Sequence, residues 1–362
     1  MNSSVFATSL RRVSTNLLFV VLTALFQFTY SQQIPEKTSA PVSTLLPART
    51  VVSENIVYKT DERGKSIAMD IYRPKTAGNE KLPVLIYIHG GGWVQGDKTI
   101  RADSYIEDMI LKLVEKQYAV VSIDYTLVGP DVHFPAPVQD CKDAIRWVRK
   151  NAEKYHFDTD NIGLFGASAG AHLSLLAAYT DDTQFKGSQE LAPYPATVNY
   201  VVDNFGPADL NKLLHTRAGR FPVFLIGLFA KKIVEIRENL IRGISGYEIK
   251  KDKRKVVEYF KTISPVTYSS HGIPTLILQG NKDKIVPLQQ SVKLSQQLTD
   301  HNINNKLVVV EDGVHGFWTT DKAYLKSLTD QMIDFVVSQK KNAASKTPAG
   351  TTGHVRSSNL VQ

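Results

Sequence analysis

Cysteine is almost absent from this 362-residue chain, which contains only Cys141. A single cysteine excludes an intrachain disulfide, so the fold must depend on its hydrophobic core. Cys141 falls inside an amphipathic helical pattern and is interpreted as a small core residue rather than a catalytic thiol. Histidine, cysteine and carboxylate residues do not recur at metal-binding spacings, so we predict no metal and no other cofactor.

Long hydrophobic runs are also scarce. The apolar stretch at residues 17–28 is too short for a comfortable membrane span. It follows Arg11 and Arg12 and precedes small residues ending at Ser31, as in an export signal. We expect residues 1–31 to be a signal peptide cleaved after Ser31, with an uncleaved anchor as the alternative. The processed chain is then expected to be secreted or periplasmic, without a stable membrane span.

The excess of positive charge is small. The chain has 43 Lys and Arg against 35 Asp and Glu, and the basic residues lie mostly in runs mixed with acids. This pattern gives no reason to expect a nucleic-acid partner. A hydrophobic content of 43% and a charged content of 22% are ordinary for a globular protein large enough to bury a full core. The composition leaves the oligomeric state open.

Both ends of the processed chain lack periodic patterns. Residues 32–50 are rich in Pro, Ser, Thr and Ala, which indicates a flexible linker. Residues 340–362 are rich in Lys, Ser, Thr, Gly and Pro and are expected to be disordered. The globular domain is therefore predicted to span residues 51–339.

Apolar strands alternate with helical patterns through this domain. A hairpin is predicted from residues 55–59 and 66–72, and buried strands are predicted from residues 83–88 and 119–123. Further strands are predicted from residues 162–165, 198–202, 275–278 and 306–310. Helices are predicted at residues 103–116, 138–155, 169–180, 288–298 and 321–338. The alternation predicts an α/β fold with a mostly parallel sheet flanked by helices on both faces.

Residues 211–261 interrupt this alternation and are predicted to form a helical cap inserted into the core. An apolar helix is expected from Phe224 to Arg242, with Pro222 and Gly243 at its ends, followed by a basic stretch at 250–255. A plain packing helix of the main domain is the alternative. The charged residues inside the apolar helix argue against a membrane span.

The sequence Gly166-Ala167-Ser168-Ala169-Gly170 lies between a predicted strand and a predicted helix. G-x-S-x-G in this setting is typical of a nucleophile elbow, where small neighbours permit a strained turn that exposes the serine. The N–H group of Ala169 would then point toward a developing oxyanion. An ordinary glycine-rich turn is the alternative interpretation.

Two further polar residues follow predicted strands in the order that this motif requires. His315 is the predicted general base, and Asp283 is the predicted acid that orients it. Because parallel strands end at one edge of a sheet, both side chains are expected near Ser168. Asp312, three residues before His315, competes with Asp283 but is interpreted as a turn residue.

A third strand leads into His89-Gly90-Gly91-Gly92-Trp93. Glycines let the backbone approach a substrate closely and leave N–H groups free to bind an oxyanion. Gly91 and Gly92 are the favoured donors beside Ala169, and Gly90 is also a candidate. His89 is interpreted as a brace for the loop, and Trp93 is expected to contact the substrate.

These motifs together resemble the α/β-hydrolase superfamily, in its carboxylesterase and lipase-like branch, over about residues 55–338. The resemblance implies an α/β-hydrolase fold. Ala167 stands where hormone-sensitive-lipase-like esterases commonly have an acid, and the sizeable insertion lies at 211–261 rather than at the N-terminus. Both departures favour the related feruloyl- and acetyl-esterase-like group.

The resulting hypothesis is a secreted serine esterase that acts through an acyl-enzyme. Ser168 would attack the ester, His315 would transfer the proton, and Asp283 would orient His315. Its substrate would be a small-molecule or polysaccharide-linked ester, such as an acetyl or feruloyl ester. A serine peptidase of the same fold and a non-catalytic binding protein of this fold are the alternatives.

Overall fold

The computed structural model describes residues 40–341, except residues 77, 79, 220–222, 224–229 and 319. The predicted signal peptide, residues 32–39 of the predicted linker and residues 342–362 of the predicted tail lie outside the described residues.

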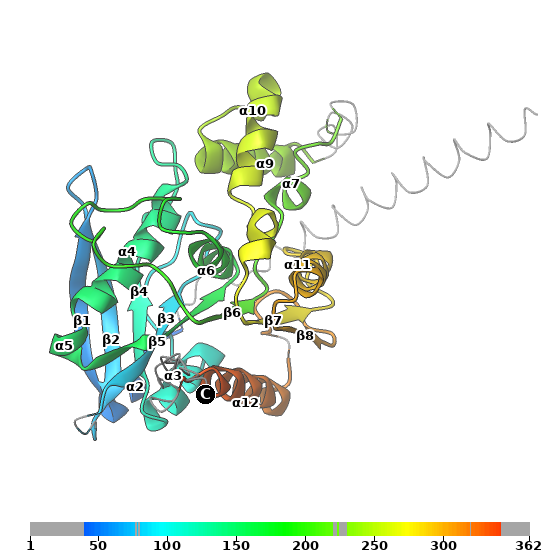
Figure 1. Cartoon of the computed structure of the whole chain (residues 1–362). Coiled ribbons are helices and arrows are strands. Elements are labelled where there is room, and N and C mark those ends of the chain that lie inside the picture. The colour runs from blue at the N-terminus through cyan, green and yellow to red at the C-terminus, as the bar shows by residue number, and fades with distance from the viewer. Residues whose placement is uncertain are drawn as a thin grey trace, which may run out of the picture.

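An eight-stranded sheet in the order β1-β2-β4-β3-β5-β6-β7-β8 forms the centre of the fold (Figure 1). β1 pairs antiparallel with β2, and β2 pairs antiparallel with β4, whereas all later neighbours are parallel. The predicted hairpin and mostly parallel sheet are therefore confirmed. The strands are β1 (Thr50–Thr60), β2 (Ser66–Pro74), β3 (Leu82–Ile88), β4 (Ala119–Ile123), β5 (Phe157–Ala167), β6 (Tyr200–Asn204), β7 (Thr275–Gly280) and β8 (Asn305–Val310).

Helices cover both faces of this sheet (Figure 1). Along β3, Val84 and Ile86 belong to one buried cluster with residues of α4, α6 and α11, whereas Leu85 and Tyr87 belong to another with residues of α3 and α12. Cys141 is buried in the first cluster, as predicted. The helices are α3 (Tyr105–Glu115), α4 (Ala136–Lys150), α5 (Ala152–Tyr155), α6 (Ala169–Tyr179), α11 (Gln289–Asp300) and α12 (Lys322–Ser338).

The segment directly before β1 is folded, which corrects the prediction of a flexible linker up to residue 50. Helix α2 covers Leu45–Arg49, and the side chain of Leu46 is buried. Val42 also forms an antiparallel bridge with Arg101. One buried leucine among Pro, Ser and Thr residues gives too little periodicity to be recognised in the sequence.

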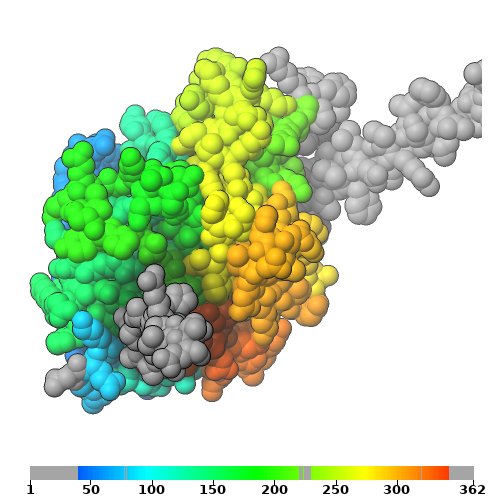
Figure 2. Space-filling view, in the orientation of Figure 1, coloured from blue at the N-terminus to red at the C-terminus, as the bar shows by residue number. Residues whose placement is uncertain are grey.

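In its described residues, the segment with the predicted cap has three helices, which project together from the body of the molecule (Figures 1 and 2). They are α7 (Leu210–Leu213), α9 (Lys231–Ser245) and α10 (Ile249–Thr262), and the short 3-10 helix η1 (Pro265–His271) follows. Residues 224–229 of the predicted apolar helix lie outside the described residues. Within the described part of the chain, no helix is long and apolar enough to cross a membrane.

The predicted end of the apolar helix at Gly243 is wrong. α9 continues to Ser245, and Gly243 is buried inside it. The stop is Gly246, whose left-handed φ of 74° ends the helix and whose N–H donates to the carbonyl of Arg242. Two glycines three residues apart present the same signal in the sequence, and only the backbone conformation separates them.

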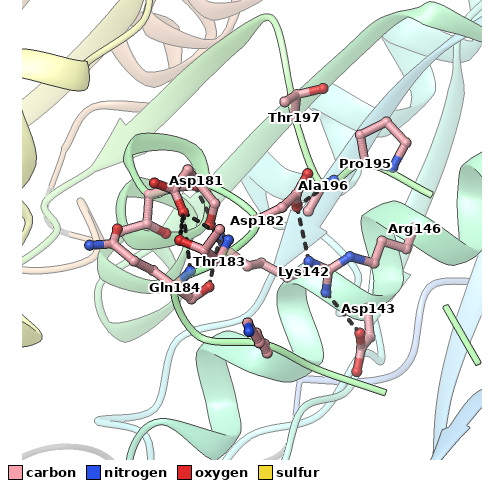
Figure 3. A network of polar contacts seen from close by, with 12 residues as sticks. Lys142, Asp143, Arg146, Asp181, Asp182, Thr183, Gln184, Pro195, Ala196 and Thr197 are labelled. Atoms are coloured by element: carbon pink, nitrogen blue, oxygen red, sulfur yellow. Dashed lines mark hydrogen bonds and ion pairs between the residues drawn. The ribbon is translucent and has the colours of Figure 1, made fainter. Parts of the chain in front are cut away.

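A polar network with the buried side chains of Lys142 and Arg146 at its centre ties the exposed connection after α6 to helix α4 (Figure 3). The Nζ of Lys142 donates to the backbone carbonyls of Thr180 at 2.9 Å and Gln184 at 3.3 Å. Arg146 donates to Asp182 at 2.9 Å. These bonds fix the start of the long connection that brings the chain from α6 to β6, the neighbour of β5.

Candidate active site

Ser168 occupies a tight turn between β5 and α6. β5 ends at Ala167 and α6 begins at Ala169, and Ser168 between them has a φ of 54° and a ψ of −118°. A non-glycine residue in this region carries about 1–3 kcal/mol of strain, which persists only where the surroundings impose it. The half-buried serine thus has the geometry expected of a nucleophile elbow.

The two glycines of the elbow allow the close packing that imposes this strain. A Cβ added to Gly166 would lie 2.4 Å from the backbone nitrogen of Ala171. One added to Gly170 would lie 2.0 Å from the carbonyl oxygen of Ile88. Helix α6 can therefore start directly beside the ends of β5 and β3 only because both positions lack a side chain.

A hydrogen-bonded chain runs from Ser168 through His315 to Asp283. The Nε2 of His315 lies 2.9 Å from the Oγ of Ser168, and its Nδ1 lies 2.7 Å from the Oδ2 of Asp283. With its proton on Nδ1, the imidazole donates to Asp283 and accepts from the hydroxyl of Ser168. The structure therefore brings together the three residues selected from the sequence.

The carboxylate of Asp283 is fixed on all sides. Its Oδ1 accepts from the backbone N–H groups of Ile285 at 2.8 Å and Val286 at 2.9 Å. Its Oδ2 accepts from the Nε2 of Gln279 at 3.0 Å as well as from His315, and the side chain is fully buried. Asp312, the competing acid, is an exposed residue with a left-handed φ of 53°. The geometry thus selects Asp283.

His89 braces the glycine loop after β3, as predicted. Its Nδ1 donates to the carbonyl of Gly90 at 2.7 Å, and its ring stacks on Tyr125 with a centroid separation of 4.3 Å. Burial lowers the pKa of His89, which favours the neutral ring. The hydrogen bond to Gly90 and the stacking on Tyr125 together hold the backbone of the loop in place.

Of the three loop glycines, Gly90 lies directly against the elbow. A Cβ added to Gly90 would lie 3.5 Å from the Cβ of Ser168 and 2.9 Å from the carbonyl oxygen of Ala167. Gly91 and Gly92 have left-handed φ values of 115° and 60°. The three glycines therefore turn the chain sharply beside the nucleophile, while Ala169 opens helix α6 on its other side.

Trp93 requires a correction, because its side chain points into the protein interior. Only 3% of the residue is exposed, and the indole packs edge-on against Phe134 and His172. Its Nε1–H group donates to the Nδ1 of His172 at 3.2 Å. The indole is thus committed to buried contacts, and the prediction that Trp93 contacts the substrate does not match its position.

Trp318 is an exposed aromatic residue beside the site that was not predicted from the sequence. It is 68% exposed, and its ring centroid lies 6.5 Å from that of His315. A Cβ added to Gly316, which has a φ of 83°, would lie 2.2 Å from the indole. The position of Trp318 three residues after the predicted base His315 could have indicated that it lies near the site.

We expect Gly90→Ala to lower kcat for ester substrates by about 10²–10³-fold, the usual effect of losing one oxyanion donor. The added methyl group would lie 2.9 Å from a backbone oxygen and would displace the loop from the elbow. Steady-state kinetics measure the effect. Gly78→Ala is the matched control because its added Cβ meets nothing within 4 Å. An unchanged kcat in Gly90→Ala would place the oxyanion donors elsewhere.

Among the described residues, no group of three or more histidine, cysteine or acidic side chains could hold a metal ion. The site brings together a strained serine, an imidazole, a buried carboxylate and a glycine loop. This constellation at the carboxyl ends of parallel strands defines the chain as an α/β-hydrolase. The model of the BD-FAE family matches residues 69–298, and the chain belongs to that family.

Named relatives place the chain in the esterase branch. It is 28% identical over 267 residues to Esterase LipC and 32% identical over 240 residues to Esterase LipQ, both of Mycobacterium tuberculosis. The alignments cover 73% and 66% of this chain but only 59% and 51% of those relatives. A truncated carbohydrate esterase from gut microbiota is 26% identical, with a TM-score of 0.60 over 83% of this chain and 99% of that one.

Proposed function

We propose that this protein is a serine hydrolase that cleaves carboxylic esters through an acyl-enzyme. The observation that carries the proposal is the hydrogen-bonded chain from Ser168 through His315 to Asp283 at a strained elbow. A serine hydroxyl is a weak nucleophile unless a base lies within hydrogen-bond reach, and here the base lies 2.9 Å away.

The proposed reaction has two halves that use the same groups. Ser168 Oγ attacks the ester carbonyl while its proton passes to Nε2 of His315, and Asp283 stabilises the resulting imidazolium. Backbone N–H groups of the glycine loop and of Ala169 hold the negatively charged oxygen. His315 then protonates the leaving alcohol. In the second half, His315 deprotonates a water molecule that attacks the acyl group, and it returns that proton to Ser168 Oγ as the bond to the acyl group breaks and the carboxylic acid leaves.

We propose that the substrates are acetyl or feruloyl esters of polysaccharides. We also propose that the enzyme is exported and acts on them outside the cytoplasm. The similarity to a carbohydrate esterase supports this class, as does Trp318, an exposed indole beside His315. An aromatic face offers a flat apolar surface to a sugar or aryl ring while its edge stays in water. The proposed alcohol or acyl group would thus stack at the mouth of the site.

We expect Trp318→Ala to lower kcat/KM for acetylated xylo-oligosaccharides by about tenfold, the equivalent of one lost aromatic contact. Hydrolysis of ethyl acetate, which has no ring to stack, should be unchanged. Tyr324→Ala removes another exposed aromatic residue, on α12, and serves as the control variant. Equal losses on both substrates would show that Trp318 supports the site rather than binding the ring.

The general test of the function is turnover of p-nitrophenyl acetate and butyrate, followed by a panel of feruloyl esters and acetylated xylan. A peptide p-nitroanilide serves as the amide counterpart. We expect ester hydrolysis and no amide hydrolysis. Faster cleavage of the amide would favour the serine peptidase, and no turnover of any substrate would favour a binding protein.

A further inference from the structure

The backbone of the glycine loop is strained beyond its glycines. Gly91 and Gly92 have positive φ values, but so does Trp93, at 66°. Tryptophan gains nothing locally in the left-handed region, which costs a non-glycine residue about 1–3 kcal/mol. Contacts of Trp93 with the surrounding protein therefore maintain this conformation: its carbonyl accepts from the backbone N–H of Val128 at 2.9 Å, and its indole is held by buried side chains.

The hydrogen-bond partner of the indole is one histidine, His172 of helix α6. Its Nδ1 accepts the indole N–H of Trp93 at 3.2 Å, and its Nε2 donates to the carbonyl oxygen of Ile263 at 2.8 Å. The same residue donates its backbone N–H to the carbonyl of Ser168 at 3.1 Å. His172 therefore contacts the elbow, the glycine loop and the end of α10 at once.

Only one protonation state of His172 satisfies both ring contacts. The indole N–H is a donor and needs an acceptor, whereas the carbonyl of Ile263 needs a donor. A neutral imidazole with its proton on Nε2 meets both needs. The ring is completely buried, and burial lowers its pKa to about 4, which keeps it neutral at pH 7.

The insertion approaches the same cluster from a second side. The ring of Phe134 packs edge-on against both Trp93 and His172. The backbone N–H of Phe134 donates to the carbonyl of Ile244 in α9, and its own carbonyl accepts from the hydroxyl of Tyr259 in α10. The two long cap helices are therefore linked to the glycine loop through the buried rings of Trp93, Phe134 and His172.

We propose that His172 is a positioning residue that clamps Trp93, and with it the oxyanion loop, to the end of cap helix α10. The clamp fixes the loop relative to Ser168, because His172 lies one turn into the helix that Ser168 begins. Because the clamp ends on α10, the position of the cap also affects the conformation of the glycine loop. This inference rests on the proposed function and adds a link between the cap and the reacting atoms.

Two substitutions separate the clamp from simple core packing. His172→Gln retains an acceptor for the indole and a donor for the carbonyl of Ile263, whereas His172→Phe retains the ring and its edge contacts but neither hydrogen bond. We expect His172→Phe to lower kcat for p-nitrophenyl acetate by about 10–100-fold with little change in KM, since small displacements of preorganised groups cost that much. His172→Gln should restore most of the lost kcat.

A second readout does not depend on turnover. The chain has three tryptophans, so the ¹H–¹⁵N spectrum contains three indole N–H signals, and Trp93→Phe identifies that of Trp93. We expect this signal to move in His172→Phe and to stay near its wild-type position in His172→Gln. Trp93→Phe should lower kcat as much as His172→Phe, and the double variant should lose no more than either one.

The outcomes are distinct. An indole signal that is the same in wild type and His172→Phe overturns the clamp, whatever the turnover. Wild-type kcat in either His172→Phe or Trp93→Phe, or equal losses in His172→Phe and His172→Gln, overturns the positioning role. If His172→Phe fails to fold, Trp93→Phe and His172→Gln still decide the question. A wild-type protein without ester turnover overturns the proposed function instead.

Discussion

Replacing Ser168 with alanine is expected to lower kcat for p-nitrophenyl acetate by about 10⁴–10⁶-fold, to the level of the uncatalysed reaction plus binding effects. The substitution removes the hydroxyl oxygen that lies 2.9 Å from Nε2 of His315. The glycine loop and elbow remain, so substrate binding should change little. Steady-state and single-turnover kinetics measure kcat and KM separately.

The fold of Ser168→Ala is expected to be intact. Alanine is as small as the neighbours of Ser168 and adds no atom to the tight contact between β5 and α6. Ser338→Ala, at the exposed end of α12, makes the same chemical change away from the site and should keep full activity. Comparable rates for wild type and Ser168→Ala would mean that the observed hydrolysis uses another group.

The second large effect is expected from Asp283→Asn, which should lower kcat by about 10⁴-fold. The amide oxygen of asparagine can still accept from the N–H groups of Ile285 and Val286, so the loop keeps its shape. Its NH₂ group then faces Nδ1 of His315, which must become an acceptor. The proton moves to Nε2, and His315 can no longer accept the proton of Ser168.

The pH–rate profile and the melting temperature of Asp283→Asn distinguish this tautomer effect from unfolding. A stable protein with a very low kcat at all accessible pH values is expected. Asp312→Asn is the control, because Asp312 is an exposed acid three residues from His315. A larger loss in Asp312→Asn than in Asp283→Asn would contradict the assignment of the orienting acid.

The positions of Ser168, Asp283 and His315 could be predicted because each follows a parallel strand. β5, β7 and β8 end at the same edge of the sheet, so residues far apart in the sequence must meet there. Hydrophobic runs identify β5 and β7 because these central strands are buried on both faces, and the edge strand β8 keeps an apolar run although it is only partly buried. The elbow added a local signal, because only small residues tolerate the turn.

Features that depend on the direction of a side chain or on the residue that ends a helix could not be predicted. Trp93 follows the glycine loop directly, yet its indole points inward, because His172 and Phe134 provide a polar partner and a ring to pack against. The sequence shows neither contact. In the same way, Asn151 separates α4 from α5 within a pattern that reads as one helix. The exposed Trp318 has no periodic neighbours to mark its place.

The most direct test is labelling with a fluorophosphonate, which reacts preferentially with an activated serine. Intact-mass and peptide-mapping spectra of the labelled wild type should show one adduct per chain, on the peptide that contains Ser168. Asp283→Asn and His315→Ala should label far more slowly. An unlabelled wild-type protein, or an adduct on a different serine, would contradict the claim that His315 and Asp283 activate Ser168.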